Sequence, residues 1–151
     1  MGIRHRHLFC FGSLITLLLL SSGPAYAEWL WIDNGKPGMT IYVNPDTIHR
    51  KGDRVKMWEL YDFEKPEHVA DTSHLSFKMQ HECDCTEGRL RVVAATFFSG
   101  NMGRGTVIYR SSVEREWESS PPGSVNHDLW EFACSKKRLQ AQLYPIEGGA
   151  G

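Results

Sequence analysis

The sequence of 151 residues has no excess of charge of either sign, because 17 lysine and arginine residues stand against 18 aspartate and glutamate residues. Nucleic-acid-binding domains usually show a basic excess, so this balance excludes that class of protein. The composition, 41% apolar and 23% charged, excludes disordered, collagen-like and multi-pass membrane chains. The sequence also lacks internal repeats and low-complexity linkers, which favours a single domain.

Common catalytic motifs are also missing. The sequence contains no H-E-x-x-H, G-x-S-x-G or P-loop pattern. The glycines of residues 100–105 lie between two expected strands, and phosphate-binding loops join a strand to a helix, so these glycines are assigned to a turn. The acids Asp62, Glu64 and Glu67 are assigned to a solvated loop. We therefore expect neither an enzyme nor a cofactor.

Long apolar runs are absent except at the N-terminus. Leu8 to Leu20 follows the positive charges of Arg4 and Arg6, and Ala25-Tyr26-Ala27 supplies the small residues of a cleavage site before Glu28. At about 1.5 Å per residue this run is about 20 Å long as a helix, shorter than the roughly 30 Å hydrocarbon core of a membrane. Residues 1–27 are therefore predicted to be a cleaved secretory signal peptide.

Removal of this segment leaves residues 28–151, which contain three cysteines and no further transmembrane candidate. We expect one domain over residues 28–145 and a disordered tail over 146–151. Export places the cysteines in an oxidising compartment, either the periplasm or the outer cell surface.

The remaining chain favours extended structure separated by turn residues. The expected strands run from Glu28 to Ile32, Met39 to Val43, Arg54 to Phe63, Leu75 to Cys85, Arg89 to Ser99 and Thr106 to Val113. A short turn-like connection is expected over residues 44–48, and a longer loop over 64–73. Sequential strands with short connections predict an antiparallel meander.

The segment from Leu75 to Cys85 shows the clearest strand pattern, because apolar and polar residues alternate strictly. This period of two predicts one buried face and one wet face. The buried set comprises Leu75, Phe77, Met79, His81, Cys83 and Cys85.

The period changes after Pro121-Pro122-Gly123. Ser124 is a suitable helix N-cap, and the apolar residues that follow recur at helical spacing: Val125, Leu129, Phe132 and Ala133. Cys134 lies on this helix and Lys136 to Arg138 lie near its end. A C-terminal helix that packs on one face of an antiparallel sheet gives an α+β fold.

The cysteines allow two interpretations. A disulfide from Cys134 to Cys83 or Cys85 would join the helix to the sheet, and the shared parity of the two strand cysteines does not choose between them. A Cys83–Cys85 bridge is disfavoured, because two residues of extended chain separate the Cα atoms by about 6.6–6.8 Å. Alternatively, His81, Cys83 and Cys85 could bind zinc or copper, with His74 or Cys134 completing the set.

Five tryptophans are many for a chain of this length, and most are expected in the core. Trp29 and Trp31 share one parity of an expected edge strand. If exposed, they would form a candidate partner-binding patch, or the edge would pair with a second subunit to form a homodimer.

Several of these segments occur in an order that resembles the surface-adhesin protein E-like domain of exported proteins from Gram-negative bacteria. The resemblance rests on Trp29, the segment from Ile41 to Ile48, the segment from Val55 to Phe63, Glu82-Cys83-Asp84-Cys85 with Arg91, Trp117, Pro122-Gly123-Ser124 and Cys134. It covers nearly all of the chain after the signal.

The resemblance implies a sheet of about six strands with a C-terminal helix that a disulfide ties to it. Asp84-Cys85 and Cys134 match the cysteine positions of the family, so the implied pair is Cys85–Cys134, and Cys83 departs from the pattern. The resemblance further implies a non-enzymatic interaction module, adhesin-like, whose partner is a host or envelope protein. The alternative function is periplasmic binding of a metal or small ligand through His81, Cys83 and Cys85.

Overall fold

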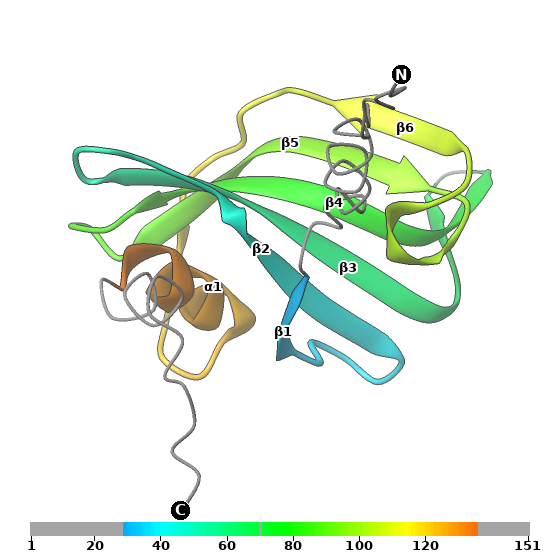
Figure 1. Cartoon of the computed structure of the whole chain (residues 1–151), viewed down its shortest axis with the longest axis horizontal. Helices are drawn as coiled ribbons and strands as arrows, with labels where there is room; N and C mark the ends of the chain where they lie inside the picture. The colour runs from blue at the N-terminus through cyan, green and yellow to red at the C-terminus, as the bar shows by residue number, and fades with distance from the viewer. Residues whose placement is uncertain (1–28, 70, 136–151) are drawn as a thin grey trace, which may run out of the picture.

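The computed structural model describes residues 29–69 and 71–135 of the chain. These residues form one antiparallel sheet and one α-helix (Figure 1), and a short 3-10 turn lies between two strands of the sheet. The elements are β1 (Leu30–Asp33), β2 (Met39–Lys51), β3 (Arg54–Val69), β4 (Thr72–Asp84), β5 (Arg89–Phe98), η1 (Asn101–Gly103), β6 (Val107–Ser111), β7 (Glu118–Ser119) and α1 (Val125–Cys134).

The sheet is a meander, since its strand order β1-β2-β3-β4-β5-β6 follows the chain. Each neighbouring pair is antiparallel, and β7 adds two residues beside β5. The β2–β3 connection is a two-residue turn in which Gly52 has a φ of +60°, a conformation that glycine adopts without strain. The expected α+β fold with a six-stranded meander and a C-terminal helix is confirmed.

Two segments assigned to loops are strand. β2 continues to Lys51, and the β3–β4 hairpin covers most of residues 64–73. The register shifts between Asn44 and His49, and again between Asp62 and Glu67. Pro45 and Pro66 lie at these irregularities, where a residue without a backbone N–H is tolerated. The Thr47 hydroxyl accepts a hydrogen bond from the Trp58 N–H at 3.0 Å, so the ladder is completed by a side chain.

The core lies between α1 and one face of the sheet, which we call the helix face. Leu129, Phe132 and Ala133 of α1 pack against buried residues of four strands, β2 to β5. The fully buried side chains from the sheet include Ile41, Val43, Val55, Met57 and Cys83. Ser124 caps α1 as expected, because its side chain accepts a hydrogen bond from the His127 N–H at 3.2 Å.

The opposite face of β4 is less exposed to solvent than the alternation predicts, because Ser76 and Asp84 are buried there. The Ser76 hydroxyl donates to the Gly100 carbonyl and accepts from the Gly103 N–H, so the η1 turn covers it. Asp84 accepts from two arginines and two backbone N–H groups. Local polar contacts, which a binary pattern does not encode, account for both exceptions.

The predicted signal peptide, residues 1–27, and the predicted tail, residues 146–151, lie outside the described residues, as do Lys136 to Arg138. Within residues 29–69 and 71–135, no helix is long and apolar enough to cross a membrane.

Candidate interaction surfaces

Trp31 projects from the edge strand β1, and 62% of it is exposed. Its indole N–H donates to Asn34 Oδ1 at 3.2 Å, which orients the ring on the surface. Trp29 is half-buried, with the Lys78 ammonium 5.5 Å from its ring centroid. The two tryptophans proposed as one patch therefore differ, and Trp31 alone offers a large apolar surface.

A second aromatic surface crosses four strands of the helix face. The ring centroids of Tyr61 and Phe77 are 4.5 Å apart, those of Phe77 and Phe97 are 5.0 Å apart, and those of Phe97 and Tyr109 are 5.8 Å apart. Exposure increases along this row, from 9% for Tyr61 to 50% for Tyr109. The row therefore begins in the core and ends at the sheet edge formed by β6.

Beside the exposed end of this row is a hollow of about 330 Å³, which we call the aromatic groove. Its lining includes Val69, Met79, Phe97, Tyr109 and Val113. Val69 and Val113 are 44% and 63% exposed. Large apolar side chains so exposed around a hollow are typical of a protein-binding surface.

The aromatic groove was not predicted from the sequence, although part of its signal is present there. Phe97 and Tyr109 both lie in segments expected to be strands, but nothing in their spacing indicates that they face each other. The structure pairs Phe97 with Tyr109, and β5 contains an extra residue opposite β4 between Val92 and Ala94. Such a bulge changes which side chains share a face, so a regular alternation misassigns them.

Glu59 and His81 form a polar pair inside the apolar core. Glu59 is completely buried, and its Oε2 atom lies 2.8 Å from His81 Nδ1. Burial raises the pKa of Glu59 more than the histidine lowers it. Burial disfavours the charged form of His81, but attraction to Glu59 outweighs it and raises the pKa of His81. The pair therefore retains protons to higher pH than the free side chains do.

The structure gives no support to the alternative metal set. The Cys85 sulfur is bonded to Cys134, so it supplies no thiolate, and His81 Nδ1 contacts Glu59. Burial raises the pKa of Cys83 well above its usual range, which keeps that thiol neutral. Within residues 29–69 and 71–135, no group of three His, Cys, Asp or Glu side chains is placed to hold a metal ion.

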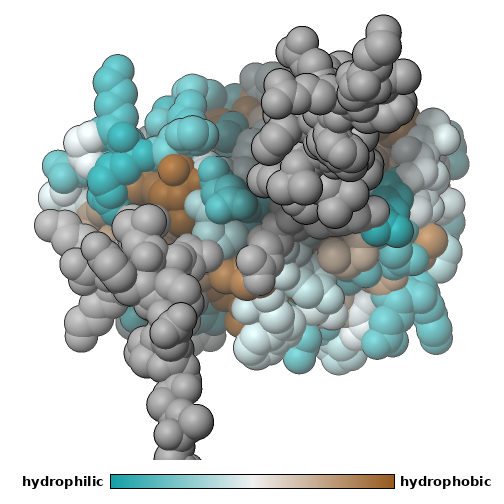
Figure 2. Space-filling view, viewed as in Figure 1, coloured by the Kyte–Doolittle hydropathy of each residue, from teal (hydrophilic) through white to brown (hydrophobic). Residues whose placement is uncertain are grey.

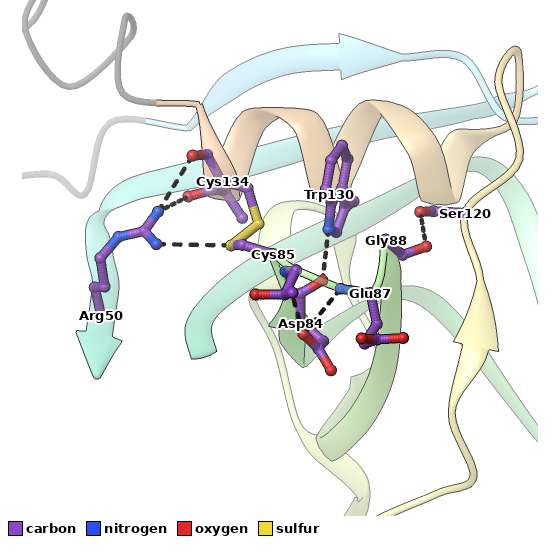
Figure 3. The surroundings of a disulfide bond; sticks show 10 residues. Arg50, Asp84, Cys85, Glu87, Gly88, Ser120, Trp130 and Cys134 are labelled. Carbon is purple, nitrogen blue, oxygen red and sulfur yellow. Dashed lines mark hydrogen bonds between the residues drawn. A yellow bond between two sulfur atoms is a disulfide. The ribbon is translucent and has the colours of Figure 1, made fainter. Parts of the chain in front are cut away.

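The disulfide Cys85–Cys134 joins the end of β4 to the last turn of α1 (Figure 3), as the family resemblance implied. Its Cα atoms are 5.5 Å apart. Arg50 lies beside it, with one guanidinium nitrogen 3.3 Å from the Cys134 carbonyl oxygen and another 3.7 Å from Cys85 Sγ. The Trp130 indole N–H donates to the Asp84 carbonyl at 2.9 Å, so the junction has a covalent and a hydrogen-bonded tie.

Comparison with protein families matches most of the described chain to a known family. The family described as surface-adhesin protein E matches residues 29–135, which include the sheet, the helix and the disulfide. No curated protein matches the sequence.

Solved structures of protein E from Haemophilus influenzae are similar in fold. Crystal form II is 15% identical, covers 72% of this chain and 96% of its own, and superposes with a TM-score of 0.54. Protein E from non-typeable Haemophilus influenzae is 17% identical, covers 80% of this chain and 91% of its own, and has a TM-score of 0.53. At this identity the likeness concerns the backbone fold.

Proposed function

Because this chain belongs to the surface-adhesin protein E family, we propose that it is an exported, non-enzymatic interaction module that binds a protein of the host or of the bacterial envelope. The single observation that supports this function best is the aromatic groove. It offers a binding partner an exposed tyrosine and two exposed valines beside a hollow. Tyrosine is enriched among residues that dominate binding energy, because it combines a large apolar area with a hydroxyl group.

The proposal includes export through the predicted signal, residues 1–27, and a folded domain over residues 28–145. The disulfide supports export, since such bonds persist in oxidising compartments. It also includes Trp31 as a second contact, because its ring is exposed on the other edge strand. We infer no role for nucleic acid, given the balanced charge of the chain.

The test is a binding assay with the mature, oxidised protein. The protein is presented to envelope proteins of the native bacterium and, separately, to immobilised extracellular-matrix proteins. Tyr109→Asp with Val113→Asp should weaken binding at least about tenfold, since a buried charge in an apolar contact is costly. Glu131→Lys, on the exposed side of α1, is the matched control and should bind as the wild type.

A loss confined to Trp31→Ala would instead place the contact on β1 and overturn the role of the groove. Binding that all variants retain would exclude both surfaces. Protease treatment of intact cells separates the two locations, because a protein on the outer surface is cleaved and a periplasmic one is protected. Cleavage only after outer-membrane permeabilisation would exclude a host partner.

A further inference from the structure

The β2–β3 hairpin ends in a group of basic side chains on the face of the sheet opposite α1. His49 pairs with Lys56, and Lys51 pairs with Arg54. Opposite residues of an antiparallel pair share a face, and Val55, between Lys56 and Arg54, points into the core. Figure 2 shows hydrophilic side chains gathered where this hairpin lies. We call this group the basic hairpin surface.

Positive charge is concentrated at this end of the molecule. The described part of the chain contains more acidic than basic side chains, yet half of its lysines and arginines lie on the hairpin or on the neighbouring end of β5. These six residues are Arg50, Lys51, Arg54, Lys56, Arg89 and Arg91. A cluster of one sign in an otherwise acidic domain creates a local field that attracts anions.

The acids nearby are already engaged by arginines. Asp84 binds Arg54 at 3.1 Å and Arg89 at 3.2 Å. Glu82 binds Arg91 at 2.6 Å. Among the described residues, Lys51 and Lys56 take part in no ion pair, and Asp53 in the turn is the one acid of the hairpin tip. Basic residues lie opposite each other across this strand pair, which is unfavourable unless an anion lies between them.

The cations surround a hollow of about 510 Å³. Its lining comprises His49, Arg50, Lys51, Arg54, Lys56 and Glu82. One arginine of this face is held in place before any ligand arrives. Arg54 stacks on Trp117 at 4.4 Å from the ring centroid and pairs with Asp84. Arg50 pairs with Val55, and its guanidinium lies on the helix face, where it donates to two backbone carbonyls of α1. A site whose cations are already ordered loses less side-chain entropy on binding.

We propose that the basic hairpin surface binds a linear sulfated polysaccharide. Cations repeat across neighbouring strands at about 5 Å and along each strand at about 7 Å, so one extended polyanion can contact several of them. Lys51 and Lys56 supply ammonium groups that no acid engages in the described part of the chain, and these groups attract the sulfates of such a polymer. A membrane surface fits less well, because stable attachment takes a second, apolar signal. In the described part, the exposed large apolar residues line other surfaces.

The test measures binding of a heparin decasaccharide to the mature, oxidised protein by calorimetry or fluorescence at 0.05, 0.15 and 0.2 M NaCl. Wild-type affinity should fall with salt, because binding releases the counterions condensed on the polymer. Lys51→Ala with Lys56→Ala should weaken binding at 0.15 M salt by about tenfold or more and should reduce the salt dependence. Lys65→Ala with Arg104→Ala removes the same charge from exposed positions elsewhere and should leave affinity within about twofold.

Four results would overturn the proposal. The first two are no binding of heparin at 0.05 M salt and an equal loss of heparin affinity in both double variants. The other two are binding to phosphatidylglycerol vesicles, or to single-stranded DNA of matched charge, that is as tight as binding to heparin. The outcome is independent of the aromatic groove, because Tyr109→Asp with Val113→Asp should retain heparin binding. Failure here and failure of the protein-partner proposal are therefore distinguishable.

Discussion

Glu59 illustrates how one residue can make the stability of this fold depend on pH. Its carboxyl group is completely buried, Oε2 contacts His81, and Oε1 is buried without a hydrogen-bond partner. Since the pKa values of both Glu59 and His81 are raised, the folded pair binds more protons than the unfolded chain does. Its contribution to stability is therefore full below the unfolded values, about 4.5 and 6.5, and is lost as pH rises through the folded values.

Glu59→Gln should change the sign of this contribution. Without the carboxylate, burial outweighs the weaker attraction of Glu118 and lowers the pKa of His81, so the variant gains stability as pH rises through about 6.5. The stability advantage of the wild type over Glu59→Gln should be largest near pH 5.5 and should shrink toward pH 8, by up to about 1.4 kcal/mol per pH unit for each proton involved. Urea unfolding at a series of pH values measures the difference.

Other groups also titrate in this pH range, so the wild type and the variant have to be compared at each pH. Burial lowers the pKa of His74, so His74 opposes the wild-type trend near pH 6, and comparison of wild type with variant removes its effect. Burial would raise the pKa of Asp84, but hydrogen bonds from Glu87 N–H and Arg89 and the charge of Arg54 lower it. The contribution of Asp84 to stability is therefore lost only below about pH 4, outside the range of this measurement. A stability difference between wild type and Glu59→Gln that stays constant from pH 5.5 to 8 would refute the role of the pair.

At the scale of elements, the disulfide determines how firmly α1 covers the sheet. The bridge closes a loop between residues 49 positions apart. The loop-entropy model assigns such a closure roughly 4 kcal/mol, within the usual range of about 2–5 kcal/mol. Cys85→Ala with Cys134→Ala should therefore lower the melting temperature by about 10 °C or more in a domain of this size, as measured by circular dichroism.

Cys83→Ala provides the matched control, because Cys83 is buried and unbridged. Its loss removes one sulfur atom from the core and should cost about 1 kcal/mol. Dithiothreitol should reproduce the effect of the double variant in the wild type and have no effect in the double variant itself. An unchanged melting temperature in the double variant would show that packing of Leu129 and Phe132 alone holds the helix.

The sequence predicted the elements whose signals are local. Strict alternation identified β4, and the Ser124 cap with helical spacing identified α1. The prediction of a loop over residues 64–73 was wrong, because most of these residues belong to the long β3–β4 hairpin. Glu64 and the residues after it are of types common in loops, and the two strands pair there only after a register shift around Pro66. Tertiary pairing overrides such local signals.

The candidate surfaces were harder to predict for the same reason. Trp31 could be proposed from edge position and parity, and the structure exposes it. The aromatic groove depends on which residues of β5 and β6 face each other, and the bulge near Val93 determines this. The pairing of Cys134 with Cys85 followed from the family resemblance, since the parity of the strand left Cys83 equally eligible.

The whole molecule separates its surfaces by chemistry. The aromatic groove lies at the β6 edge on the helix face, and the basic hairpin surface lies on the opposite face at the β2–β3 turn. Trp31 belongs to β1, at the other edge of the meander. One domain could therefore hold a protein and a polyanion at the same time, because neither surface shares a residue with the other.

The edges of the meander also determine whether the protein forms a homodimer. In the described part of the chain β1 pairs only with β2, so its outer edge can pair with a second copy, and Trp31 would cover the contact. β1 has only four residues, so we expect a weak dimer, with a Kd in the micromolar range or above. Sedimentation equilibrium between about 5 and 200 μM should show a mass that rises with concentration.

Two charge-introducing variants distinguish the edges of the sheet in this measurement. Trp31→Lys should keep the protein monomeric at every concentration, because a lysine on an edge strand opposes pairing of that edge. Tyr109→Lys places the same charge on β6 and should leave the dimer intact. Loss of the dimer in Tyr109→Lys alone would move the subunit contact to β6, where it would compete with the proposed protein partner for the aromatic groove. A wild type that stays monomeric at the highest concentration would exclude self-association through either edge in this range, leaving both edges free for other partners.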